Sequence, residues 1–190
     1  MNLFPRRLIG TLSLVGLAAM ILLPLPAAAQ YVGARKCRPC HLPQFKTWQQ
    51  TRMVKAFELL RPGMAAQAKT AHKLDPAKDY TTDPECLSCH TTGYGQPGGF
   101  VSMQETPKLA GIQCEACHGP GQGYLKPELM SLKNKKYKRS EVVAAGLVIP
   151  SEETCTVCHN QKSPFYKPFE YESRKKQGTH KHLKLKYPHE

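Results

Sequence analysis

The hydrophobic positions follow a helical period most clearly in one stretch of the chain, residues 44–60. Its apolar side chains fall within half of a helical circumference: Phe45, Trp48, Met53, Ala56, Phe57 and Leu60. Pro43 suits the first turn of such a helix, and the sequence Arg-Pro-Gly at residues 61–63 suits its end. We therefore expect a helix over residues 44–60.

The rest of the chain has weaker patterns. Shorter helices are expected over residues 64–73 and 152–160, and a weakly patterned helix over residues 170–186. The glycine-rich stretch 93–100 predicts a loop that leads into a short strand from Phe100. These patterns indicate a mainly α fold that is low in regular secondary structure.

The composition provides few apolar side chains for a hydrophobic core. The chain has 190 residues, of which 41% are hydrophobic and 8% aromatic, with Gly 14 and Pro 16. That content is enough to exclude full disorder, and the length suits a single domain. Something other than aliphatic side chains is therefore expected to fill part of the interior.

Residues 1–29 have the features of an export signal. Two arginines precede the stretch 8–23, which is apolar apart from Gly, Ser and Thr, and Ala27 and Ala29 fit a peptidase site. The alternative is an uncleaved membrane anchor, because this run is near the minimum spanning length. Cleavage would leave residues 30–190 as the mature domain. Export would place this domain in the periplasm, which is an oxidising compartment.

Every cysteine of the chain belongs to a Cys-x-x-Cys-His unit. The four units are Cys37-Arg-Pro-Cys40-His41, Cys86-Leu-Ser-Cys89-His90, Cys114-Glu-Ala-Cys117-His118 and Cys155-Thr-Val-Cys158-His159. This is the attachment signature of c-type haem. Two thiols at this spacing add to the two vinyl groups of one porphyrin, and the following histidine is the proximal ligand of its iron.

Zinc sites and disulfides are the two alternatives for paired cysteines. Neither explains a histidine directly after every pair. Four covalently bound haems in so short a chain would themselves form most of the core, which accounts for its thin composition. We therefore expect one multihaem cytochrome c domain wrapped around four closely packed haems.

The chain is strongly basic, with a formal charge of +13. Losing the two signal arginines lowers this charge to +11, and eight haem propionates lower it to +3 with ferrous iron or +7 with ferric iron. Basic residues concentrate in residues 133–139 and 174–186. These stretches are either solvated surface that neutralises propionates or a docking face for acidic redox partner proteins. Nucleic acid is not expected to be a partner.

Five segments resemble a known family: residues 48–57, 73–80, 93–99, 114–121 and Pro168-Phe169. They are similar to cytochrome c-554, the tetrahaem electron carrier of ammonia-oxidising bacteria, over nearly the whole mature chain. The resemblance implies three haems with two histidine ligands each and a fourth that is five-coordinate and open. It also implies hydroxylamine oxidoreductase as electron donor and links the open haem to nitric oxide chemistry.

The distal ligands that the resemblance implies match this sequence only in part. One of them matches His180, whereas the other two fall on Met53 and near Met130. Each methionine is either an ordinary core residue or a thioether ligand. If both bind iron, the reduction potential is higher than with two histidines, because Met/His ligation raises it.

The resemblance also implies that the open haem is the one at residues 86–90, beneath a loop equivalent to residues 167–169. Lys167 of this loop either supplies protons or binds the iron itself. Outside the motifs, His72 and His189 are expected to be exposed.

Three functions fit these observations. We favour an electron carrier that relays electrons between redox partners. The second is an enzyme that reduces a small nitrogen oxide, such as nitric oxide, at the open haem. The third is a subunit of a membrane-bound or filamentous haem complex, which applies if the apolar N-terminus stays attached.

Overall fold

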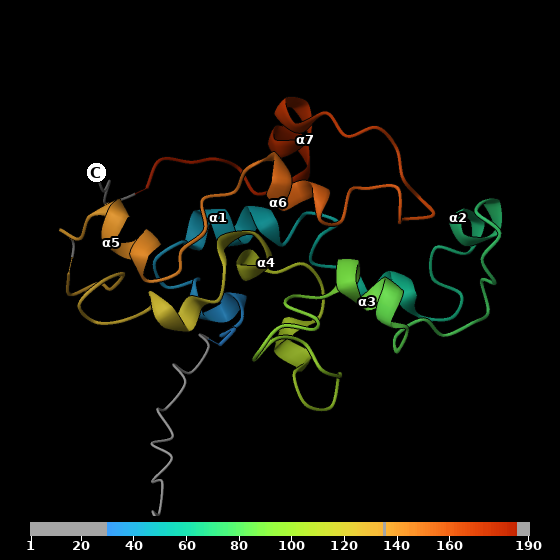
Figure 1. Ribbon diagram of the computed structural model, residues 1–190, viewed down its shortest axis with the longest axis horizontal. Coiled ribbons are helices and arrows are strands. Elements are labelled where there is room, and N and C mark those ends of the chain that lie inside the picture. Colours follow the sequence, from blue (N-terminus) through green and yellow to red (C-terminus); the bar gives the residue numbers. More distant parts are fainter. Residues whose placement is uncertain (1–29, 135, 186–190) are drawn as a thin grey trace, which may run out of the picture.

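The computed structural model describes residues 30–134 and 136–185. Short helices joined by long loops form the fold (Figure 1). In chain order they are η1 (Ala34–Lys36), α1 (Leu42–Trp48), η2 (Phe57–Leu60), α2 (Ala66–Ala71), α3 (Pro84–His90), η3 (Pro107–Leu109), α4 (Cys114–His118), η4 (Gly121–Gly123), α5 (Arg139–Ala144), α6 (Glu152–Thr156) and α7 (Tyr171–Gly178).

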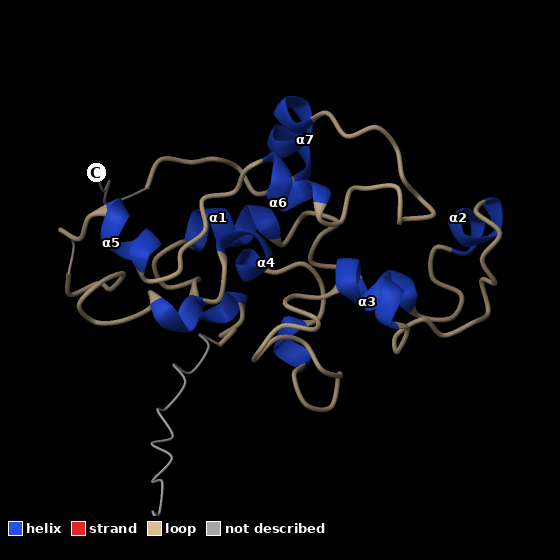
Figure 2. Ribbon diagram, viewed as in Figure 1, coloured by secondary structure: helices blue, strands red, loops and turns tan. Residues whose placement is uncertain are grey.

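The expected fold class is confirmed: helices and loops make up the described residues, with no strand among them (Figure 2). The strand expected from Phe100 is wrong. Its backbone N–H donates to the carbonyl of Thr92 at 3.0 Å, which closes the glycine-rich loop on itself. An isolated bridge between Thr91 and Ala110 is the one β pairing of the described chain.

The long helix expected over residues 44–60 is also wrong, because α1 ends at Trp48 and turns follow up to η2. Two tertiary contacts explain the break. The Trp48 indole N–H donates to the carbonyl of Ile112 at 2.9 Å, and the Ile112 N–H donates to the carbonyl of Met53 at 2.9 Å. The segment around Ile112 thus uses a carbonyl that a continuous helix would need for its own ladder.

The shorter helices are confirmed with narrower bounds. In the stretch 64–73, α2 covers Ala66–Ala71, and in the stretch 152–160, α6 covers Glu152–Thr156. The C-terminal helix α7 stops at Gly178, so residues 179–185 lie outside it. Residues 1–29, including the expected signal, and His189 lie outside the described residues.

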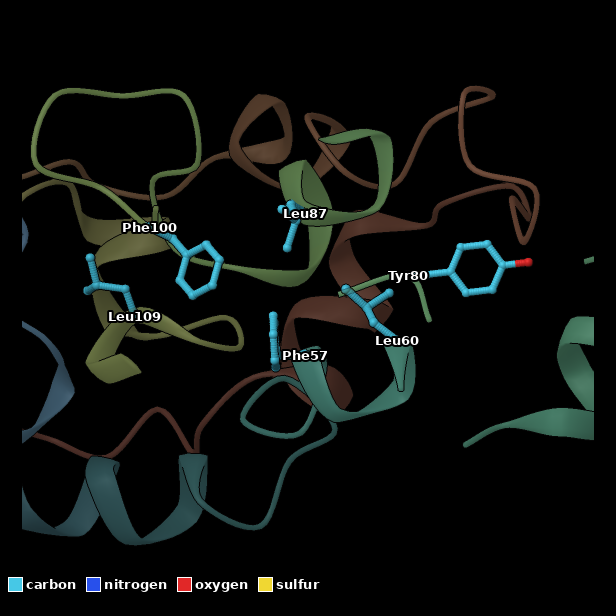
Figure 3. Packing of buried hydrophobic residues seen from close by; sticks show 6 residues of the cluster. All are labelled: Phe57, Leu60, Tyr80, Leu87, Phe100 and Leu109. Atoms are coloured by element: carbon cyan, nitrogen blue, oxygen red, sulfur yellow. The ribbon is translucent and has the colours of Figure 1, made fainter. Parts of the chain in front are cut away.

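The apolar core is divided into three small clusters. The largest joins η2, α3 and η3 through Phe57, Leu60, Tyr80, Leu87, Phe100 and Leu109 (Figure 3). A second surrounds Phe45 and Trp48 of α1, and a third surrounds Tyr124 and Val142. Separate clusters fit a chain in which large non-protein groups complete the interior. No helix of the described part is long and apolar enough to cross a membrane.

Candidate haem-binding site

Each Cys-x-x-Cys-His unit lies on a turn of helix. The second and third occupy α3 and α4, and the fourth begins in α6 and ends in the turn that follows. The first bridges η1 and α1, with His41 directly before the helix. In a helical turn, residues i, i+3 and i+4 face the same side. Both thiols and the imidazole of a unit can therefore reach the same haem.

The fold brings the four units into contact across long distances in sequence. The thiols of Cys37 and Cys114 are close enough that each shifts the pKa of the other, raising it at Cys37 and lowering it at Cys114, which places the first unit beside the third. The Cys158 thiol donates to the carbonyl of Ser88 at 4.0 Å, which places the fourth unit beside the second, and its interaction with the Cys89 thiol lowers the pKa of Cys89 to about 6. Because these thiols would carry the porphyrin edges, haems held by the four units would fall into two close pairs.

The third and fourth units connect the two pairs. Burial, followed by electrostatic repulsion from the neighbouring Cys155, raises the pKa of Cys117 to about 11. This interaction requires the two thiols to be close. The positions of the thiols would therefore order the haems as first, third, fourth and second.

Two proximal histidines are oriented by backbone carbonyls. The Nδ1 atom of His90 lies 2.6 Å from the carbonyl oxygen of Ala56, and that of His118 lies 3.3 Å from the carbonyl oxygen of Val148. A carbonyl at Nδ1 fixes the tautomer and leaves Nε2 for a metal. Burial lowers the pKa of His118, which favours the neutral imidazole that iron binds. Sequence alone gives no signal for either carbonyl.

The rings of His118 and His180 lie near each other, at a spacing that fits an iron site. Their ring centroids are 6.3 Å apart, with 26° between the ring planes. Metal–imidazole bonds are about 2.0 Å long, so the centres of two rings on one metal lie about 6 Å apart. His180 also has its Nδ1 atom 3.0 Å from a carbonyl, that of Lys181.

His182, two residues further on, is held differently. Its Nε2 atom lies 3.1 Å from the Thr179 hydroxyl and 3.2 Å from the carbonyl oxygen of Lys175. The nitrogen that a metal would need is thus already occupied. This contrast supports His180, and not His182, as the distal ligand opposite His118.

Met130 lies near the first unit. A cavity of about 390 Å³ is lined by Cys40, His41 and Met130, together with Tyr137 and residues of the C-terminal segment. Met130 is half-buried and packs beside Tyr124. A thioether and a proximal histidine on the walls of one cavity fit a haem between them.

Met53 lies in the turn that holds His90. The Ala56 N–H donates to the carbonyl of Met53 at 3.1 Å, and the carbonyl of Ala56 is the one that orients His90. The Nε2 atom of His90 consequently points away from this turn. The half-buried Met53 is therefore on the wrong side to be opposite His90 and is available to another haem.

The loop expected over the second haem contacts the fourth unit. The ring of Phe169 stacks on that of His159 at 4.5 Å and 24°, and Lys167 is exposed. The cover over the second haem stays a prediction. His72 is exposed as expected, and its ring lies 4.6 Å from that of Phe165.

Taken together, the paired thiols, the carbonyl-oriented imidazoles and the neighbouring His118 and His180 rings fit covalent haem at the motifs. His41, His90, His118 and His159 would hold the irons on the proximal side. Haem supplies an iron that alternates between the ferric and ferrous states by one electron. The protein's part is to hold these irons close together and to choose their ligands.

Comparison with known proteins gives one consistent result. The family model described as cytochrome c554 and c-prime matches residues 36–119. Cytochrome c-554 of Nitrosomonas europaea is 39% identical over 140 residues, which are 71% of this chain and 60% of that protein. The chain thus spans less than two thirds of this curated relative.

A solved structure extends the likeness over more of both chains. The reduced state of cytochrome c554 from Nitrosomonas europaea superposes with a TM-score of 0.73 and 33% identity. The match covers 85% of this chain and 90% of that one. Its c-type haem agrees with the four attachment motifs and with the helical, strand-poor fold. This protein is therefore a multihaem c-type cytochrome, and the chain belongs to the cytochrome c554 family.

Proposed function

We propose that this protein is a periplasmic electron carrier that relays electrons between redox partners through four closely packed haems, two of them ligated by methionine. The observation that carries the proposal is the proximity of the four units, with the Cys158 thiol 4.0 Å from the carbonyl of Ser88 in the second unit and electrostatic interactions linking the first to the third and the third to the fourth. Electron tunnelling slows steeply with distance, so adjacent porphyrin edges favour rapid transfer. The family membership supports the same role.

The geometry of the described residues supports the ligand sets that we propose. His118 pairs with His180, and Met130 pairs with His41 across their shared cavity. Met53 cannot pair with His90, because that imidazole points away from its turn. By elimination, Met53 serves the haem of His159. Thioether ligation favours ferrous iron, so these two haems work at a higher potential than a His/His haem.

Low-temperature electron paramagnetic resonance and near-infrared magnetic circular dichroism on the oxidised holoprotein test the ligand sets. We expect two His/Met haems and one His/His haem. Met130→Leu and Met53→Leu should each remove one His/Met signal and lower the midpoint potential of one haem. The conservative size of leucine keeps the packing nearly unchanged.

Met103→Leu is the matched control, because Met103 is a half-buried methionine packed against the Phe57 and Leu109 cluster. It should leave all four haem spectra unchanged. Three His/His haems and one high-spin haem in the unmodified protein would overturn the methionine proposal and would return this chain to the ligand set of its relatives.

We further propose that acidic partner proteins dock on the basic surface formed by α7 and the segment after it. Arg174, Lys176 and Lys181 are exposed there, and the neighbouring His180 brings this surface to the third haem. Charged docking faces raise association rates at low salt. The rate of reduction by an acidic donor protein should therefore fall as ionic strength rises.

Charge reversal distinguishes docking from simple neutralisation of propionates. Lys176→Glu should slow reduction by the acidic donor at low salt and leave reduction by a small neutral reductant unchanged. Lys73→Glu, an exposed lysine beyond α2, is the control. Equal effects of the two variants would argue against a specific docking face.

A further inference from the structure

Glu115, inside the third haem motif, is a buried carboxylate that the attachment chemistry does not use. Its side chain is 2% exposed. It accepts three backbone hydrogen bonds, from the N–H groups of Val32 at 2.8 Å, Gly33 at 2.6 Å and Gly121 at 2.6 Å. Three N–H donors therefore converge on this one carboxyl group.

The surrounding backbone is shaped to receive this carboxylate. A Cβ atom at Gly121 would lie 2.9 Å from Oε1 of Glu115, so only glycine allows the loop to approach so closely. Gly33 has a φ of +85°, which turns its N–H toward the same side chain. No ion pair among the described residues includes Glu115. Its negative charge is therefore held by N–H dipoles and is not cancelled by a neighbouring cation.

The charge lies next to the thiols of two haem units. Glu115 directly follows Cys114 and precedes Cys117 by two residues. The interaction with Cys114 raises the pKa of the Cys37 thiol most, burial raises it further, and the Glu115 carboxylate adds to both. Burial raises the pKa of Tyr124, and the charges of Cys37 and Glu115 contribute. For Cys114 of the third unit, the interaction with Cys37 lowers the pKa most, whereas burial and the Glu115 charge oppose this lowering. The field of this carboxylate therefore reaches groups of both the first and the third unit.

A fixed negative charge near a haem acts on its redox equilibrium. Reduction adds one electron to ferric iron to give ferrous iron, with no bond formed or broken. The iron site loses one positive charge in this step. A nearby anion in a low-dielectric interior therefore stabilises the ferric state over the ferrous state.

We propose that the buried Glu115 carboxylate holds the reduction potential of the haem at the third motif below the value it would have beside a neutral side chain. Glu115 acts on the iron through the electrostatic field and touches no reacting atom, so it is a positioning residue. The inference requires haem at the third motif and is independent of methionine ligation, because neither Met53 nor Met130 is involved.

The test is a potentiometric titration of the holoprotein, monitored by electron paramagnetic resonance to resolve the individual haems. Glu115→Gln removes the charge and keeps the shape. We expect the ferrous-to-ferric ratio of the third haem to rise about tenfold at fixed ambient potential, which corresponds to about 59 mV for one electron. Glu115→Asp keeps the charge but shortens the side chain, so it should lower the melting temperature and leave the potential close to its original value.

Glu85→Gln is the matched control, because Glu85 adjoins the motif residue Cys86 but is exposed to solvent, which screens its charge. It should leave all four potentials unchanged. A Glu115→Gln protein that loses stability but keeps its original potentials would overturn the proposal and leave Glu115 as a clamp between the N-terminal segment and α4. If Glu115→Gln fails to mature, Glu115→Asp still tests the proposal. A ferrous-to-ferric ratio of the third haem raised about tenfold in Glu115→Asp would equally overturn the proposal, since the charge is still present in that variant.

Discussion

Replacing Gly111 by alanine should disturb Met53 through the backbone alone. Gly111 has a φ of +76°, and a Cβ atom there would lie 2.6 Å from the carbonyl oxygen of Val54 and 3.2 Å from that of Met53. Both clashing atoms belong to the backbone, so they cannot rotate away as a side chain would. The variant must shift the turn that carries Met53.

The expected cost has two parts. A left-handed conformation costs a non-glycine residue about 1–2 kcal/mol. Forcing an extra carbon into a packed site costs about 1–3 kcal/mol more. Gly111→Ala should therefore lose about 2–5 kcal/mol of unfolding free energy. Gly95→Ala isolates the first part, because Gly95 has a φ of +75° but no heavy atom within 4 Å of an added Cβ; it should lose about 1–2 kcal/mol.

Urea unfolding of the two holoproteins, followed by far-ultraviolet circular dichroism, measures both costs. Near-infrared magnetic circular dichroism on the same samples should report a weakened His/Met signal in Gly111→Ala and an unchanged spectrum in Gly95→Ala. Equal losses of stability in the two variants would refute the claim that the segment around Gly111 holds the Met53 turn in place.

Three further outcomes follow from the described contacts. Leu109→Ala removes a side chain that is 0% exposed and should cost about 2–5 kcal/mol in urea unfolding; a loss below about 1 kcal/mol would contradict the packing of this cluster. Trp48→Phe deletes the donor to the carbonyl of Ile112 and leaves that oxygen unpaired, at a cost of about 1–3 kcal/mol by the same assay. His180→Ala should convert the third haem from low to high spin in its visible spectrum, whereas His182→Ala should not; equal spectra would exclude His180 as the ligand.

The haem attachment chemistry could be predicted from the sequence because it is local. Two thiols and an imidazole at positions i, i+3 and i+4 share one face of a single helical turn, whatever the remaining chain does. The weak patterns outside residues 44–60 likewise indicated a mainly α fold that is low in regular secondary structure, and the scarcity of core residues indicated that other groups help to fill the interior. The ends of helices could not be predicted as well from the sequence. The break after Trp48 depends on hydrogen bonds with Ile112, which is far along the chain.

Only the tertiary structure decided which units meet and which side chains face them. The contact of Cys37 with Cys114, and that of Cys89 with Cys158, join units that no spacing rule relates. The assignment of His180 as a distal ligand depends on its ring lying near that of His118. The burial of the Glu115 carboxylate depends on the N-terminal segment crossing α4, where the N–H of Gly33 donates to it. A sequence specifies the chemistry within one turn of helix, but distances between turns are set by how the whole chain packs.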